Sequence, residues 1–242
     1  MVAKNGKELG EMAEDLRKTS EEMGLSMNLS KTKVMANFSA LGDIKVGDTK
    51  IEQVSEYRYL GQIISFVNKT EKELKIRRAN AWKAFWSQKY LLKSNLGLRT
   101  KIKIFESTVL PVLTYGAQTW ALTSKQLKKL QAAQNTMLRS ILGARLTDKV
   151  SLDEIYERTK SRKVRVVARS LTFKYAGHVT RNCGNKWNVI LTSWVPHWGK
   201  WSRGRPRIRW ADELRTTVGS DWATKSKNRK IWKSLVAAYA QN

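Results

Sequence analysis

The sequence predicts an α+β protein that is mostly α-helical, and three observations lead to this class. Residues 1–66 combine one amphipathic helical segment with short runs rich in Val, Ile, Tyr and Phe, which favours a small β-containing piece. From residue 68 onward, apolar side chains recur at helical spacing. Apolar residues make up 41% of the 242 residues, which is enough to bury a core.

The N-terminal elements are indicated by local signals. Asn5 can cap a first helix, with Glu8 three residues later as its capping-box partner, and Gly24 ends that helix. Two glycine–aspartate turns, at Gly42 and Gly47, separate the later runs. Strand character is found at 25–29, at 33–38 and, as two strands joined by a turn, at 51–66.

The rest of the chain is expected to be helical. Thr123 and Gln126 form a capping box for a helix that ends at Gly143, and Ser151 with Glu154 begins a shorter helix. The other expected helices cover 69–95, 98–120 with a kink at Pro111, 162–182, 187–194, 206–218 and 225–240.

The charge is large and unevenly distributed. The formal net charge is +26; residues 1–60 hold 9 basic and 10 acidic residues, and residues 61–242 hold 37 basic and 10 acidic residues. Such a charge excludes an ordinary enzyme acting on small neutral substrates. It indicates a polyanionic partner, with nucleic acid the first choice and an anionic membrane the second.

Several other classes are excluded by what the sequence contains. One cysteine, Cys183, excludes an internal disulfide framework and zinc fingers that need two thiolates. The start has no apolar signal core, and no run of about 18 apolar residues occurs. We therefore expect an intracellular protein that does not span a membrane. No phosphate-binding glycine loop, nucleophile motif or metal-ligand cluster is found, so the residues themselves indicate no catalytic or metal site.

Basic side chains are the candidate binding residues. On the first long helix they are Lys75, Arg77 and Arg78, where few acids compensate them. In the segment 162–182, an apolar stripe lies roughly opposite three arginines. These three are Arg162, Arg165 and Arg169.

A second basic string surrounds Pro206, which suits the first turn of a helix. Its arginines would be unfavourable at a helix N-terminus unless an anion such as phosphate sits there. Its Arg-Gly-Arg-Pro core also resembles an AT-hook, which binds the minor groove, and a plain solvated loop is the third interpretation. The arginines are Arg203, Arg205, Arg207 and Arg209.

Tryptophan is concentrated near the C-terminus, where seven of the ten lie between Trp187 and Trp232. Those at helical positions are expected to be core, namely Trp187, Trp210, Trp222 and Trp232. For Trp198 and Trp201, core packing and stacking on unpaired bases are both open.

Several strings, taken in order, resemble the reverse transcriptases of non-LTR (LINE-type) retrotransposons. GLSMNLSKTKVM at 24–35 resembles the segment after the paired catalytic aspartates, and SEYRYLGQIIS at 55–65 resembles the primer-grip hairpin. The stretch 110–143 resembles the thumb and the segment after it. FKYAGHVTR at 173–181 and RGRPRIRWADEL at 203–214 resemble the C-terminal domain of the same elements.

The resemblance implies an RNA-directed DNA polymerase with three parts. These are a palm remnant at 1–66, a helical thumb at 67–145 and a basic C-terminal nucleic-acid-binding domain at 146–242. It places Lys31, with Lys33 as the lesser alternative, near the incoming nucleotide and its pyrophosphate. It implies that Tyr59, Leu60 and Gly61 support the 3′ end of the primer.

The same resemblance implies partners and a cofactor. The partners are an RNA template, a DNA primer or target DNA, in a ribonucleoprotein of the nucleus and cytoplasm, and Mg²⁺ serves the full-length enzyme. The paired aspartates have no counterpart here, so we expect a truncated, inactive polymerase that retains nucleic-acid binding. A host-adopted chromatin-binding module and a non-functional element remnant are the alternatives.

Overall fold

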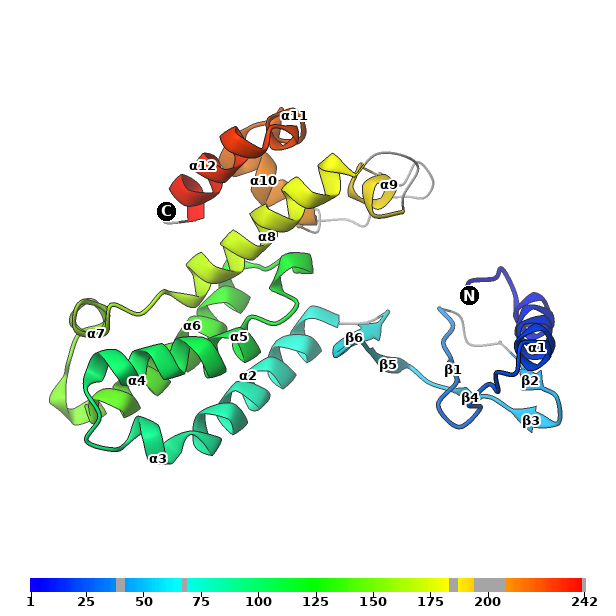
Figure 1. Ribbon diagram of the computed structural model, residues 1–242, viewed down its shortest axis with the longest axis horizontal. Coiled ribbons are helices and arrows are strands. Elements are labelled where there is room, and N and C mark those ends of the chain that lie inside the picture. The colour runs from blue at the N-terminus through cyan, green and yellow to red at the C-terminus, as the bar shows by residue number, and fades with distance from the viewer. Residues whose placement is uncertain (38–41, 67–68, 183–186, 194–207, 241–242) are drawn as a thin grey trace. The chain divides into compact units, whose positions relative to one another are not determined.

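The computed structural model describes residues 1–37, 42–66, 69–182, 187–193 and 208–240 (Figure 1). Helices predominate and the strands are short, so the predicted α+β, mostly helical class is confirmed. The chain divides into two compact units, the N-terminal unit (Met1–Lys72) and the helical unit (Glu73–Asn242). The sequence-based division into three domains stays a prediction.

In its described residues, the N-terminal unit contains one complete helix and three pairs of short strands. Helix α1 (Gly6–Glu22) begins as expected, because the Asn5 side chain accepts a hydrogen bond from the Glu8 amide. Strands β1 (Lys33–Val34) and β4 (Glu52–Gln53) pair in parallel, whereas β2 (Lys45–Val46) pairs with β3 (Thr49–Lys50) and β5 (Glu56–Tyr59) with β6 (Gln62–Ser65) in antiparallel fashion. Its small core consists of Ala13, Val34, Ile44, Val46 and Ile51.

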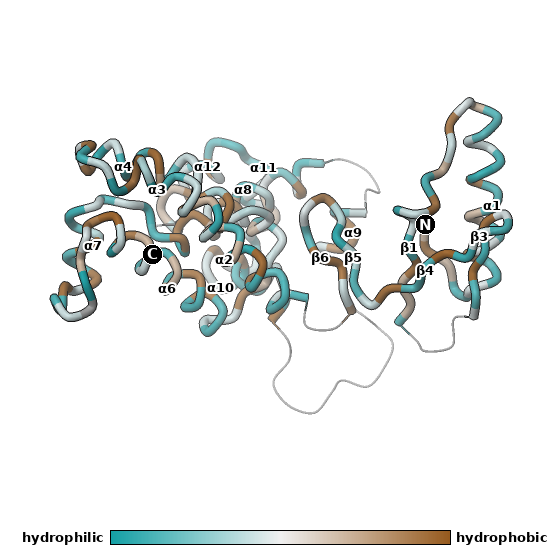
Figure 2. Tube along the Cα trace, turned by 90° about the horizontal axis from the view of Figure 1, so that it is seen from below, coloured by the Kyte–Doolittle hydropathy of each residue, from teal (hydrophilic) through white to brown (hydrophobic). Residues whose placement is uncertain are grey.

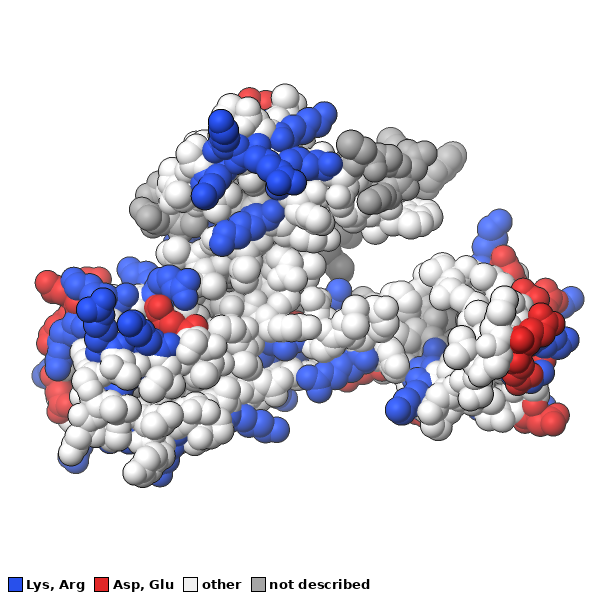
Figure 3. Space-filling view, in the orientation of Figure 1, with Lys and Arg blue, Asp and Glu red and all other residues white. Residues whose placement is uncertain are grey.

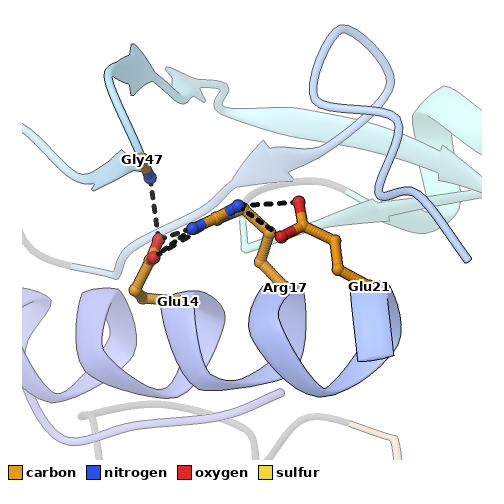
Figure 4. Close-up of polar contacts among 4 residues, drawn as sticks. All are labelled: Glu14, Arg17, Glu21 and Gly47. Carbon is orange, nitrogen blue, oxygen red and sulfur yellow. Dashed lines mark hydrogen bonds and ion pairs between the residues drawn. The ribbon is translucent and has the colours of Figure 1, made fainter. Parts of the chain in front are cut away.

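A charged cluster joins α1 to the turn between β2 and β3 (Figure 4). Arg17 pairs with Glu14 and Glu21 at 2.6 Å each, and the Gly47 amide donates to Glu14 at 2.8 Å. The Arg17 contact first, and then the Gly47 hydrogen bond, lower the pKa of Glu14 from 4.5 to about 2. The same ion pairs raise the pKa of Arg17.

The helical unit is built mainly from amphipathic helices, seen as alternating brown and teal in Figure 2. The long helices are α2 (Lys69–Ser87), α6 (Ser124–Leu142) and α8 (Val164–Arg181), and α6 has the predicted capping box of Thr123 and Gln126. The shorter ones are α3 (Lys89–Leu92), α4 (Leu98–Ile104), α5 (Leu110–Leu113), α7 (Leu152–Thr159), α9 (Trp187–Ser193), α10 (Trp210–Val218), α11 (Trp222–Lys227) and α12 (Arg229–Ala240).

Three expected helices are interrupted, and the one predicted for 225–240 is divided at Asn228 between α11 and α12. The helix predicted for 69–95 ends at Ser87, and α3 begins after Gln88. The helix predicted for 98–120 contains a π-helical turn, η1 (Phe105–Val109), just before Pro111. Proline has no amide hydrogen for the carbonyl four residues earlier and its ring crowds that carbonyl, so the turn widens there. Short 3₁₀ turns, η2 (Ala117–Thr119) and η3 (Leu146–Asp148), complete the connections.

Among the described residues of the helical unit, two apolar cores are formed, and α8 contributes to both. The first core gathers residues of α2, α4–α7 and the beginning of α8, including Val164 and Ala168. The second core packs α10–α12 against the later part of α8, through Phe173 and Ala176. The first core thus crosses the expected boundary at residue 145.

The second core has a tight contact between α8 and α12. The Trp232 ring stacks on Phe173, with centroids 5.9 Å apart, and its Nε1 donates to the Phe173 carbonyl at 2.7 Å. Gly177 makes room for this ring, because a Cβ at that position would lie 2.5 Å from Trp232 Cδ1. Within the described ranges, no helix has the length and apolar character needed to cross a membrane.

Candidate nucleic-acid interface

The two units carry very different charges. The N-terminal unit holds 11 basic and 11 acidic residues, whereas the helical unit holds 35 basic and 9 acidic residues. Figure 3 shows red and blue side chains mixed over α1 and mainly blue side chains over α11 and α12. The whole formal net charge of +26 therefore belongs to the helical unit.

The acids of the helical unit are largely occupied by ion pairs. Because they are few, most of the basic residues cannot be neutralised within the unit. The pairs are Glu73–Arg77, Glu154–Arg158, Glu106–Arg162, Glu213–Arg169, Asp212–Arg215 and Asp221–Lys225.

The predicted cations of α2 fall into two groups. Lys75 and Arg78 are exposed, as a binding surface requires. Arg77 is only 4% exposed; its guanidinium lies 2.6 Å from Glu73 and 4.5 Å from the centre of the Tyr115 ring. The structure therefore corrects the prediction for Arg77, because a buried and paired arginine holds α2 in the core and does not face a phosphate.

The arginines around α8 also differ from one another. Arg165 is exposed, whereas Arg169 is mostly buried and pairs with Glu213 of α10 at 2.6 Å, which corrects its assignment to a free face. Arg162 lies just before α8, where its amide donates to Glu106 at 2.7 Å and its side chain remains largely exposed. It borders a shallow hollow of about 490 Å³ lined also by Thr100, Lys103, Ile104, Glu106 and Ser107.

The arginine string at 203–209 is only partly described. Arg203, Arg205 and Arg207 lie outside the described residues, together with Trp194, Trp198 and Trp201. The helix expected from residue 206 begins later, as α10 at Trp210, and Arg209 is its N-cap. Its first turn carries Asp212 and Glu213, acids that suit a helix N-terminus, so the argument for a phosphate at this helix end does not apply.

The tryptophans predicted to be core differ in how far they are buried in the structure. Trp222 and Trp232 are buried, and Trp210 is partly buried with its Nε1 donating to the Gln118 carbonyl at 2.7 Å. Trp187 is 76% exposed, so the core prediction is wrong there. Helical spacing could not distinguish it, because among the residues that the structure describes none from α9 belongs to either core.

The predicted hairpin residues lie at the tight turn between β5 and β6. Leu60 and Gly61 both have positive φ angles, 48° and 76°, as a two-residue turn of type I′ requires. A leucine rarely adopts this conformation, and its side chain is 74% exposed here beside the exposed Tyr59. The turn thus presents two large apolar side chains outward.

Lys31 is linked to the same hairpin within the N-terminal unit. Its side chain is exposed, and its carbonyl accepts a hydrogen bond from the Tyr57 hydroxyl at 3.2 Å. Lys33 instead pairs with Glu52 on the neighbouring strand. The structure therefore brings Lys31 and the strand leading to Tyr59 together, although the two are far apart in the sequence.

A basic surface that the sequence analysis missed lies around the junction of α11 and α12. Arg181 at the end of α8 donates to the Ser226 carbonyl at 2.7 Å, which places it beside this junction. The exposed basic residues here are Lys227, Arg229, Lys230 and Lys233, and Arg181 lies beside them, half-buried. We call these five residues the α11–α12 basic patch. The string KSKNRK at 225–230 is the signal that could have identified it.

The magnesium ions that the resemblance implies for the full-length enzyme would need a cluster of carboxylate donors. Among the described residues, no three His, Cys, Asp or Glu side chains gather in a way that could hold a metal ion. The described residues therefore do not fit a two-metal polymerase centre, which needs converging carboxylates.

Fold and surface together define a basic, mostly helical α+β protein with exposed cations in its helical unit. Over 264 residues the chain is 31% identical to an uncharacterized transposon-derived protein of Caenorhabditis elegans, and the match covers 100% of this chain and 93% of that relative. The chain therefore belongs to this family of transposon-derived proteins. No protein-family model and no solved structure matches it.

Proposed function

We propose that this chain is a nucleic-acid-binding part of a LINE-type reverse transcriptase, comprising the end of the palm, the thumb and the C-terminal domain. The observation that carries the proposal is the charge of the helical unit, with 35 basic against 9 acidic residues. A folded unit with so much unneutralised charge needs a polyanion nearby, and phosphate backbones supply one.

The contacts of this unit would be mainly with phosphates. Lys75, Arg78 and Arg165 are exposed, and so are the four outward cations of the α11–α12 basic patch. Such contacts position a nucleic acid but carry little sequence information. The transposon origin and the exposed Tyr59–Leu60 turn support a reverse-transcriptase lineage, in which that turn would support a primer end.

A salt titration of duplex binding by the full chain tests the proposal. With about eight phosphate contacts, log affinity should fall against log salt with a slope near −7. A slope near zero, or no binding, would contradict the proposal. It would favour the alternative that the chain is a non-functional remnant of the element. A preference for A·T-rich duplex that Arg205→Ala abolishes would instead favour the host-adopted chromatin module.

A charge-matched pair of variants locates the contacts. The first replaces Lys227, Arg229, Lys230 and Lys233 by Gln; the control replaces Lys4, Lys7, Lys18 and Lys45, exposed lysines of the N-terminal unit, by Gln. Both lose four positive charges. The first should reduce the slope by about 3 to 4, and the control should leave it nearly unchanged. If both variants reduce the slope equally, the phosphate contacts are not concentrated on the α11–α12 basic patch.

A further inference from the structure

The surface formed by α2 and α3 carries exposed aromatic rings that phosphate binding does not explain. Trp86, near the end of α2, is 49% exposed. Tyr90, in α3, is 87% exposed, more than any other aromatic side chain among the described residues. Large rings are usually buried, and exposed apolar groups that lie together mark binding surfaces.

The surroundings of these rings are strongly basic. Residues 74–105 hold nine basic residues and no acidic residue. Three of the basic residues, Lys83, Lys89 and Lys93, are exposed and lie within a few positions of the two rings. Arg77 is buried and paired with Glu73, so the charge of this surface comes from the exposed cations, and near the two rings these are Lys83, Lys89 and Lys93.

The helical period places rings and cations on the same side of α2. Lys75, Trp82 and Trp86 share one face, along about 16 Å of helix axis. Arg78 and Lys83 flank this face. A different side faces the core and consists of the buried residues Glu73, Leu74, Arg77, Ala81 and Phe85.

The Trp86 ring is held in place from the protein side. Trp82 stacks against it with centroids 5.9 Å apart, and Phe85 meets it edge-on at 5.2 Å. The Lys89 ammonium lies 5.8 Å from its centre, at the outer limit of a cation–π contact, and can therefore turn toward an anion. A fixed ring with a movable cation beside it suits a base and its phosphate.

The chemistry favours nucleic acid over other macromolecules. Protein interfaces are depleted in lysine at their centres, whereas this surface is rich in it. A membrane-surface helix needs a free apolar face, but the apolar face of α2 is already buried. Exposed rings among cations are typical of proteins that stack unpaired bases and hold the backbone.

We propose that α2 and α3 bind single-stranded nucleic acid, with an unpaired base stacked on Trp86 or Tyr90 and phosphates near Lys83, Lys89 and Lys93. This inference rests on the proposed function and adds that the bound polymer has unpaired bases at this surface. A fully paired duplex keeps its base faces stacked inside, so it gains nothing from the rings.

The test compares two probes on the full chain, a fluorescein-labelled oligouridylate and a fully paired DNA duplex of equal length. Trp86→Leu with Tyr90→Leu should weaken binding of the oligouridylate by about 5- to 150-fold and leave duplex binding unchanged. Trp86→Phe with Tyr90→Phe keeps flat rings and should restore most of the affinity. Trp187→Leu removes another exposed tryptophan and serves as the control.

The outcomes separate this inference from the proposed function. If the wild-type chain binds neither probe, the proposed function fails. If it binds both and the Leu variants lose equal affinity for both, or none for the oligouridylate, the rings do not stack bases and the inference is overturned. Tyr90→Leu alone, at the more exposed position, gives the same test should the double variant fold poorly.

Discussion

The contact between Gly177 and Trp232 gives a quantitative prediction of stability. In Gly177→Ala, the new Cβ would lie 2.5 Å from Trp232 Cδ1, 2.6 Å from its Nε1 and 2.7 Å from an Arg181 nitrogen. To restore ordinary van der Waals distances, the indole must retreat by about 1 Å. It is buried and stacked on Phe173, so it has little space in which to move.

The expected loss of stability in Gly177→Ala is the cost of crowding the indole minus the gain from placing alanine in a helix. Overpacking of a core costs about 1–3 kcal/mol, and lengthening the 2.7 Å bond from Trp232 Nε1 to the Phe173 carbonyl adds about 1 kcal/mol. Alanine is better than glycine inside a helix by about 1 kcal/mol, which offsets part of this. We expect a net destabilisation of about 2 kcal/mol, or a fall in Tm of about 4–8 °C for a unit of this size.

Thermal unfolding followed by circular dichroism measures this change. Gly97→Ala is the control, because no atom lies within 4 Å of its new Cβ and its φ of −56° suits alanine. Gly97 is the N-cap of α4, where alanine is a poorer residue than glycine, so the Tm of this control should fall slightly, and by less than that of Gly177→Ala. If Gly177→Ala is as stable as the wild type, or costs the same in a Trp232→Ala background, the close packing of α12 on α8 is refuted.

Two further predictions concern the N-terminal unit. Leu60→Asn should stabilise the β5–β6 hairpin by about 1 kcal/mol, because asparagine tolerates the φ of 48° better than leucine. Hydrogen exchange of the hairpin amides should therefore become slower, and unchanged or faster exchange would contradict the prediction. Because the folded pKa of Glu14 is about 2, below the ordinary 4.5, its ionised form contributes stability above pH 4.5 that is lost as the pH falls toward 2. Glu14→Gln should therefore loosen the Gly47 amide at pH 6 but not near pH 2, measured by amide exchange, whereas Glu11→Gln, an exposed control on α1, should change it at neither pH.

Local sequence signals predicted the fold well. The caps at Asn5, Thr123 and Ser151 form as expected, because a capping side chain needs only amides three residues away. Where a helix breaks is harder to predict. The π-helical turn before Pro111 and the late start of α10 at Trp210 depend on how each segment packs, which spacing alone does not give.

The candidate interface was less predictable because exposure depends on partners distant in the sequence. Arg77 and Arg78 are neighbours in the sequence, yet only Arg77 is buried, against Tyr115 of a later segment. Its partner Glu73, four residues earlier, was a local signal that could have separated the two. The exposed rings of Trp86 and Tyr90 became evident only once the buried face of α2 was known.

The sharing of α8 between two apolar cores limits how this protein can be dissected. A fragment ending at residue 145 would lose Ile155, Val164 and Ala168 from the first core. A fragment starting at residue 146 would leave those same side chains with nothing to cover them. Expression boundaries for biochemistry should therefore enclose the helical unit in one piece, and we expect its two halves to melt in a single cooperative transition.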